Sequence, residues 1–267
     1  MLTDRLRPHL ELISTLTIVA TCALLISANW SRLWPPPSDP LPTAPVSLAG
    51  AAVKGSSTAP VALIVFTDYQ CPSCRRFEVE VLPLLVREYV EPGKAVVAVR
   101  HLPLTKIHPI AFHAASAATC ALPQGKFWQL HDVMFEQQKG LTAEKVNELA
   151  AGVGIDMTTF GECMGDAGPA QVTTDLEMAR TMGLASTPAI LIGRVRGDGT
   201  VLVLSAVRGV KPTEQFARAV EQGLIAPWPW ISWLIWLALL AAVGAMGIVI
   251  RRKAMSQGIR AADQTVR

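Results

Sequence analysis

Charged residues are scarce in this chain of 267 residues. Only 17% are Asp, Glu, Lys or Arg, whereas 51% are hydrophobic, which is too apolar for an ordinary soluble protein. The formal net charge of +3 is too weak to indicate nucleic-acid binding. The sequence also lacks a second CxxC or CxxH at zinc-finger spacing, a methionine-rich or histidine-rich tract, and an internal repeat. We therefore expect neither a nucleic-acid partner nor a metal site.

The first hydrophobic segment runs over residues 12–30 and contains no charged residue. It is long enough to span a hydrocarbon core of about 30 Å, and Arg5 and Arg7 precede it. A cleaved signal peptide is the alternative. Residues 26–28 (Ile-Ser-Ala) form a poor cleavage site and the apolar run is long for a signal sequence, so an uncleaved transmembrane helix is favoured.

The second hydrophobic segment covers residues 231–250 and also contains no charged residue. Tryptophans such as Trp228 and Trp230 cluster at its start, and residues 251–253 (Arg-Arg-Lys) follow its end. Tryptophan prefers the membrane interface and cations mark the cytoplasmic side, so this segment predicts a second transmembrane helix.

Most of the cations that flank the two hydrophobic segments lie on the terminal side of each segment, which predicts that both termini are in the cytoplasm. The proline-rich segment PPPSDPLPTAP cannot pack a core and predicts an extended extracytoplasmic linker. The predicted order is cytoplasmic residues 1–11, a transmembrane helix at 12–30, the linker at 31–49, a folded domain at 50–225, a transmembrane helix at 231–250 and a basic cytoplasmic tail at 251–267.

The folded domain carries a CxxC motif between a predicted strand and a predicted helix. Residues 61–67 (VALIVFT) are apolar and rich in β-branched residues, which indicates a buried strand. Cys71-Pro72-Ser73-Cys74 follows, and then residues 75–82 with helical spacing. The free N–H groups and the dipole at the first turn of a helix stabilise a thiolate and so lower the pKa of a cysteine there. Cys71, at the start of the predicted helix, is therefore the expected nucleophile.

Cys74 lies one helical turn behind Cys71 and can attack a mixed disulfide formed there. The alternatives for a CxxC are half of a zinc site or a structural disulfide. A second landmark is Thr187-Pro188, directly before the strand-like residues 189–192. A cis peptide bond at this proline would be a specified feature of the fold.

Three segments together resemble the DsbA-like thioredoxin-fold disulfide oxidoreductases of the DsbA/BdbD/DsbG type. They are residues 59–77 (APVALIVFTDYQCPSCRRF), residues 114–135 with the core GKFWQLHDVMF, and residues 183–193 (GLASTPAILIG). The resemblance implies an α/β fold, thioredoxin-like, with a helical insertion at about 107–165. It also implies strands at 94–101 and 201–206 and a closing helix at 213–222.

The same resemblance implies roles for individual residues. Cys71 would be the exposed nucleophile and Cys74 the resolving thiol. Pro188 would be the cis-proline that faces the CxxC, and the backbone of Thr187 would receive the substrate in extended form. Recognition through the main chain implies broad specificity.

Two departures from the family bear on its redox strength. Many relatives carry a buried carboxylate six residues before the first cysteine, where this chain has Val65. The dipeptide between the cysteines is Pro72-Ser73, whereas DsbA has a histidine in the second position. Without that imidazolium we expect a less depressed pKa at Cys71 and a milder oxidant than DsbA.

Cys120 and Cys163 lie in or beside the insertion, where relatives often have cysteine too. A structural disulfide and two buried free thiols are equally compatible with the sequence. The histidines of this region lack the compact spacing of zinc ligands, so capping or packing is expected of them. Asp68 and Glu78 could tune the site, but a position at the solvated surface is the favoured interpretation.

These features predict an enzyme that makes, breaks or reshuffles disulfides in exported, cysteine-containing proteins. It would need no cofactor beyond its own Cys71–Cys74 pair. We expect it in the bacterial cytoplasmic membrane with the catalytic domain on the periplasmic side, next to a membrane redox partner. The alternative is a membrane-held chaperone or metallochaperone whose CxxC captures a client or a soft metal such as Cu(I).

Overall fold

The computed structural model describes residues 41–225, together with the helical positions 21, 25 and 28. The predicted segments 1–11, 231–250 and 251–267 lie outside the described residues, as do nearly all of 12–30 and most of the linker. Within the described part of the chain, no helix combines the length and apolarity that crossing a membrane requires.

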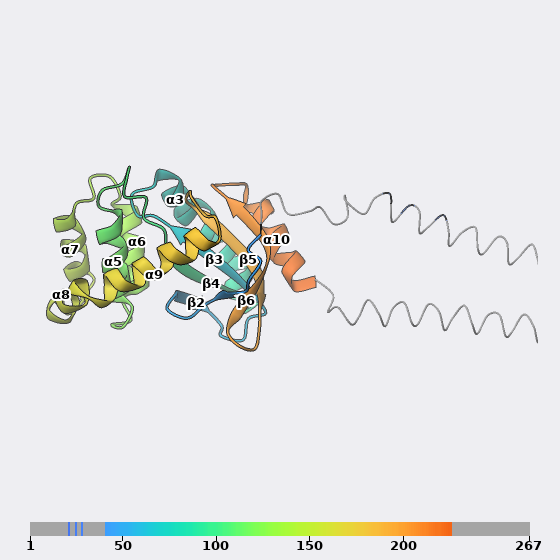
Figure 1. Ribbon diagram of the computed structural model, residues 1–267, viewed down its shortest axis with the longest axis horizontal. Helices are drawn as coiled ribbons and strands as arrows, with labels where there is room; N and C mark the ends of the chain where they lie inside the picture. Colours follow the sequence, from blue (N-terminus) through green and yellow to red (C-terminus); the bar gives the residue numbers. More distant parts are fainter. Residues whose placement is uncertain (1–20, 22–24, 26–27, 29–40, 226–267) are drawn as a thin grey trace, which may run out of the picture. The chain divides into compact units, whose positions relative to one another are not determined.

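A six-stranded mixed sheet forms the centre of the domain (Figure 1). The predicted strands at 61–67, 94–101, 189–192 and 201–206 are all present; two short edge strands were not predicted. In sheet order the strands are β1 (Val46–Ser47), β6 (Thr200–Arg208), β5 (Ala189–Val195), β3 (Val61–Thr67), β4 (Ala95–His101) and β2 (Ala52–Gly55). Only β3 and β4 are parallel. Strand β1 lies in the segment expected to be linker, and its pairing with β6 makes those residues part of the sheet.

The helix after the CxxC is longer than predicted and alternates between α-helical and π-helical turns. It consists of α3 (Pro72–Arg76), the π-helical turn η1 (Phe77–Val81), α4 (Leu82–Leu85) and a second π-helical turn, η2 (Val86–Val90). Pro83 lies between the two wide turns and has no N–H to donate, which explains an irregularity at this place. This long helix is the crossover that parallel strands require.

The insertion is helical, as expected, but extends beyond residue 165. In Figure 1 its helices gather mostly at one end of the sheet. They are α5 (Ala111–Ala121), α6 (Phe127–Glu136), α7 (Ala143–Gly152), α8 (Met157–Gly165) and α9 (Ala167–Thr181). Cys120 and Cys163 form a disulfide that joins α5 to α8, which decides between the two alternatives left by the sequence. The closing helix α10 (Thr213–Ile225) is also present.

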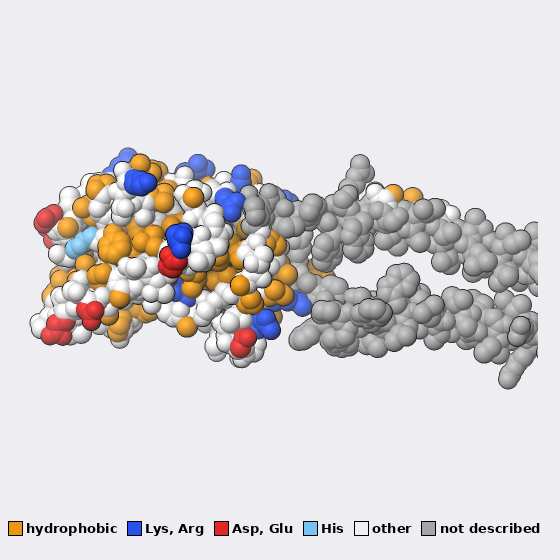
Figure 2. Space-filling view, viewed as in Figure 1, with side chains coloured by type: hydrophobic (Ala, Val, Ile, Leu, Met, Phe, Trp, Pro, Cys, Tyr) orange, Lys and Arg blue, Asp and Glu red, His pale blue; other side chains and the backbone are white. Residues whose placement is uncertain are grey.

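Strand β3 is buried on both faces, and alternate residues face two different cores. Val61, Leu63 and Val65 pack with the long helix and α10. Ala62, Ile64 and Phe66 pack on the other face, against residues that include Ala179 of α9. The continuous apolar run therefore reflects a central strand covered on both sides. On the surface shown in Figure 2, acidic and basic side chains of the described residues are scattered.

A buried ion pair ties the insertion to the sheet. Arg100 of β4 donates to Asp175 of α9 at 2.7 Å, and both side chains are 1% exposed. Arg100 also donates to the carbonyl groups of Ser47 and Ala49, while Asp175 accepts the backbone N–H of His101. One charge pair thus fixes α9, β4 and the loop after β1.

We predict that Asp175→Ala lowers the free energy of unfolding by about 3 to 5 kcal/mol, because it leaves a buried guanidinium without its partner. Urea-induced unfolding followed by tryptophan fluorescence measures the change. Glu177→Ala is the matched control, since this carboxylate lies on the same helix in an exposed pair with Arg180. A comparable loss of stability in both variants would contradict the prediction.

Candidate active site

Cys71 lies at the N-cap of α3, immediately after the turn that follows β3. Its backbone N–H donates to the carbonyl of Asp68, and its own carbonyl accepts the N–H of Arg75, the first bond of the helix. Pro72 at the first helical position needs no hydrogen-bond acceptor for a backbone N–H. The CxxC therefore has the predicted position between a strand and a helix.

The Thr187–Pro188 peptide bond is cis and lies against the CxxC, as expected. The sulfur of Cys71 donates to the carbonyl of Thr187 at 3.6 Å. Residues 116 positions apart are thereby brought together at one end of the sheet. The contact leaves the main chain of Thr187 beside the sulfur that would attack a substrate.

Both cysteines are free and buried. Cys71 is only 7% exposed, which corrects the expectation of an exposed nucleophile. A hydrogen bond from Cys74 is the largest cause that lowers the pKa of Cys71 to about 5. Burial opposes this effect, whereas the Thr187 side chain and the backbone of Cys74 and Ser73 lower the pKa further. Burial raises the pKa of Cys74 well above its usual value, and the neighbouring Cys71 raises it more. The lowered pKa favours the thiolate at Cys71 at neutral pH, which no longer donates to the Thr187 carbonyl, whereas Cys74 stays a thiol.

Two glutamines hold the loop before the CxxC against the insertion. Gln138, just beyond α6, donates its amide to the carbonyl groups of Tyr69 at 2.9 Å and Cys71 at 3.0 Å. Gln70 accepts the backbone N–H of Ile110 at 2.7 Å. Sequence reasoning missed both residues, because a glutamine carries no sign of a partner so distant in the chain.

The expectation that Asp68 is solvated was wrong. Its side chain is fully buried and accepts three hydrogen bonds, all at 2.8 Å, from the backbone of Gln70 and Leu104 and from His108 Nδ1. The bond to Gln70 spans two residues, a pattern typical of Asp in a turn after a strand. That local signal could have indicated a structured Asp68, although not the contacts with Leu104 and His108.

Glu78 is also buried, contrary to expectation. Its Oε2 lies 3.2 Å from Nε2 of His131, whose Nδ1 lies 2.9 Å from the hydroxyl of Tyr69. His131 packs within an aromatic cluster with Tyr69, Phe127 and Phe135, which agrees with the packing role expected for the histidines. The other carboxylate oxygen of Glu78 has no hydrogen-bond partner in the described part of the chain.

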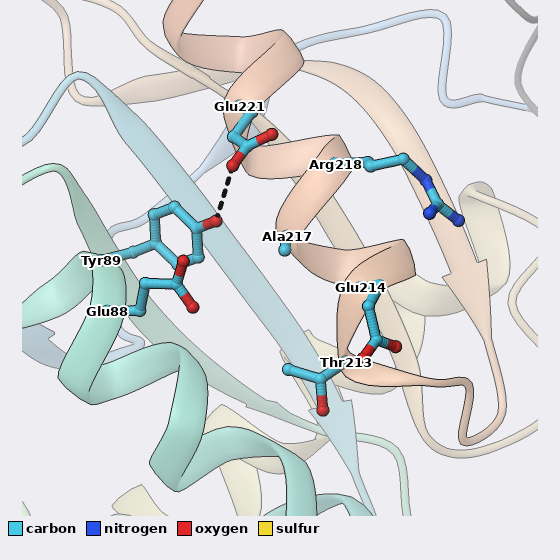
Figure 3. Close-up of a pocket in the computed structure, with 7 residues that line it drawn as sticks. All are labelled: Glu88, Tyr89, Thr213, Glu214, Ala217, Arg218 and Glu221. Atoms are coloured by element: carbon cyan, nitrogen blue, oxygen red, sulfur yellow. Dashed lines mark hydrogen bonds between the residues drawn. The ribbon is translucent and has the colours of Figure 1, made fainter.

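A pocket of about 320 Å³ opens elsewhere, between η2 and α10 (Figure 3). The hydroxyl of Tyr89 donates to Glu221 across it at 3.1 Å, which links the two helices. Its lining contains no cysteine and none of the predicted site residues; it consists of Glu88, Tyr89, Thr213, Glu214, Ala217, Arg218 and Glu221. We assign this pocket no part in the thiol chemistry.

A family model described as thioredoxin matches residues 48–201, more than half of the chain. The chain belongs to the thioredoxin family. The expected thioredoxin-like α/β fold is therefore confirmed, and the insertion of helices between β4 and β5 agrees with the resemblance drawn from the sequence.

Two curated proteins illustrate the range of relatives of this thioredoxin-family chain. The Na(+)/H(+) antiporter NhaA 3 of Salinispora tropica is 33% identical over 148 residues, which are 55% of this chain and 22% of that protein. The probable disulfide bond formation protein D of Bacillus anthracis is 34% identical over 94 residues, 35% of this chain and 43% of that protein. The chain thus spans about a fifth of the antiporter and less than half of the second relative.

Among solved structures, the chain resembles oxidised BdbD from Bacillus subtilis. The TM-score is 0.59 at 21% sequence identity, and the match covers 70% of this chain and 99% of that chain. At this identity the likeness establishes the fold.

We predict that alkylation of Cys71 by iodoacetamide rises with pH through a midpoint near 5 and is level at pH 7. The reason is that the thiolate reacts, whereas an ordinary cysteine is half ionised only near about pH 8.5. Peptide mass mapping of the reduced protein measures the rate. Cys74→Ala should move the midpoint upward, since it removes the largest cause of the lowered pKa; a wild-type midpoint near that of free cysteine would contradict the prediction.

The same pKa bears on redox strength. A value of about 5 lies between about 3.5 in DsbA and about 7 in thioredoxin. Because thiolate stabilisation favours the reduced form, we expect a reduction potential below the value of about −120 mV for DsbA. Equilibration with glutathione buffers measures it, and a potential as high as that of DsbA would refute the expectation.

Proposed function

We propose that this chain is a protein thiol–disulfide oxidoreductase. The observation that carries the proposal is the sulfur of Cys71 at the N-terminus of α3, beside the Thr187 carbonyl and hydrogen-bonded to Cys74. A depressed pKa at a helix N-terminus is typical of a nucleophilic cysteine, and the adjacent thiol of Cys74 completes the exchange.

The exchange transfers two electrons between the Cys71–Cys74 pair and the substrate, so that one pair is oxidised as the other is reduced. In the reducing direction the Cys71 thiolate attacks a substrate disulfide and releases one substrate thiolate, and Cys74 then attacks Cys71 and releases the other. In the oxidising direction a substrate thiolate attacks Cys71 of the Cys71–Cys74 disulfide and expels Cys74. A second substrate thiolate then attacks the substrate sulfur of the mixed disulfide, which forms the substrate disulfide and expels Cys71. The redox partner determines which direction predominates.

Exported proteins with cysteines are the proposed substrates. The Thr187 backbone would hold them in extended form, so that selectivity rests on main-chain hydrogen bonds. The name of the Bacillus anthracis relative, a probable disulfide bond formation protein, supports this class of substrate.

We also propose the location predicted from the sequence. The segments 12–30 and 231–250 would anchor the domain outside the bacterial cytoplasmic membrane with both termini in the cytoplasm. A membrane redox partner would then meet Cys71 and Cys74 in the periplasm. The flanking cations support this orientation.

The catalytic proposal is tested with the full-length chain in an insulin reduction assay. Wild type should accelerate the reaction and Cys71→Ala should abolish it. Cys22→Ala, which replaces the cysteine of the hydrophobic segment 12–30, is the control that should leave it unchanged. The metallochaperone alternative predicts instead tight retention of Cu(I) through purification, lost in Cys71→Ala, without catalysis. Wild-type activity no greater than that of Cys71→Ala would refute the proposal.

The location and the substrates are tested together in cells that produce Cys74→Ala. Without the resolving thiol, mixed disulfides should accumulate through Cys71, and mass spectrometry identifies the trapped clients. A membrane-impermeant maleimide applied to intact spheroplasts should label Cys71 in any untrapped fraction. Labelling only after lysis would place the domain in the cytoplasm and contradict the proposed location.

A further inference from the structure

The peptide group between Thr67 and Asp68 is held on both sides. Its carbonyl accepts the backbone N–H of Leu102 at 2.8 Å. Its N–H, which belongs to Asp68, donates to the sulfur of Cys74 at 3.4 Å. The end of β3 therefore presents a backbone donor to the resolving sulfur, with its orientation set by the loop after β4.

The side chain of Asp68 adds a second set of restraints to the same residue. It is fully buried, and its Oδ2 binds both the N–H of Leu104 and Nδ1 of His108. As the acceptor of these hydrogen bonds, the carboxylate pairs with the form of His108 that carries a proton on Nδ1. The loop that follows β4 contains Leu102, Leu104 and His108. This loop therefore binds both the carboxylate of Asp68 and the peptide group before it.

During thiol–disulfide exchange a negative charge develops on the sulfur of Cys74, to which the backbone N–H of Asp68 donates. Cys74 is fully buried, and burial raises its pKa, so its thiolate is costly to form. That thiolate must nevertheless appear, as the attacking group in resolution and as the leaving group when the Cys71–Cys74 disulfide is opened. A donor aimed in advance at developing charge needs no reorganisation during the reaction, which is the principle of an oxyanion hole.

We propose that Asp68 and His108 are positioning residues that hold the Asp68 N–H on the sulfur of Cys74 while that sulfur carries negative charge. The inference rests on the proposed function. In the step concerned, Cys74 loses its proton to solvent and its sulfur forms a bond to the sulfur of Cys71. The bond from Cys71 to the substrate sulfur breaks, and the substrate leaves as a thiolate. The carboxylate and the imidazole touch no reacting atom and act only through the backbone N–H.

A loop anchor without a role in the reaction makes a different prediction. Loosening such an anchor would lower stability, and would disturb Cys71 and Cys74 alike because both follow Asp68 within six residues. The positioning role instead predicts a selective loss at Cys74, since the hydrogen bond concerned ends on its sulfur.

The two steps can be timed separately with one equivalent of 5,5′-dithiobis(2-nitrobenzoate) and the reduced full-length chain carrying Cys22→Ala. Attack by Cys71 releases the first thionitrobenzoate, and resolution by Cys74 releases the second, both visible at 412 nm. Asp68→Ala should slow the second phase about tenfold, less than the roughly hundredfold loss when an oxyanion donor is removed outright. The first phase should stay within about twofold of wild type, since the Cys71 thiolate keeps its own hydrogen bonds.

Variants of His108 keep the test valid if Asp68→Ala does not fold. His108→Ala should also slow the second phase selectively. His108→Asn should restore much of the rate, because its amide nitrogen can replace Nδ1. Lys106→Ala is the matched control, since it removes an exposed cation from the same loop.

The outcomes separate the two proposals. A wild-type first phase no faster than that of free cysteine would refute the proposed function. A fast wild-type first phase, with both phases of the Asp68 and His108 variants slowed by the same factor or both equal to Lys106→Ala, would overturn the positioning role alone.

Discussion

The active-site end of the domain depends on the contact between two buried sulfurs. The pKa of Cys71 is lowered, and the pKa of Cys74, one helical turn away, is raised. The hydrogen bond between Cys74 and Cys71 serves both ends, because it lowers the pKa of the first thiol and raises that of the second. It requires that Cys71 sit at the helix N-terminus and Cys74 under the end of β3. Most other contacts at this end of the sheet can be understood as means of holding those two positions.

The helical insertion has a direct part in this, beyond covering the sheet. Gln138 holds the carbonyl groups of the active-site loop, and Ile110 at the start of the insertion binds Gln70. The side chain of Tyr69, a residue of that loop, packs against His131 and Phe135 of α6. The loop that carries the nucleophile is thus fixed by a separate layer of the structure, and its geometry depends on how the insertion docks. The Cys120–Cys163 disulfide lies within that layer and constrains it.

The sequence predicted the parts of the fold that follow from local patterns. The apolar run of β3 and the helix spacing after the CxxC are local properties, and the cis bond at Pro188 followed from a resemblance carried by its neighbours. The buried charges could not be predicted in that way. Asp68 meets a histidine 40 residues away and Arg100 an aspartate 75 residues away. A single charged residue is most often exposed, so only the tertiary structure reveals that these are paired in the interior.

The buried carboxylates also fix how the elements around the nucleophile are docked. Asp68 and Glu78 flank the CxxC in sequence, yet neither carboxylate lies at the solvated surface. Each instead meets an imidazole, from His108 and His131, as Asp175 meets a guanidinium farther away. Buried pairs of this kind add little stability relative to apolar packing, but they are costly to break and therefore demand one arrangement. Here the arrangement they demand joins the sheet and the active-site helix to the insertion and its leading loop, and it leaves the thiolate to the donors of α3.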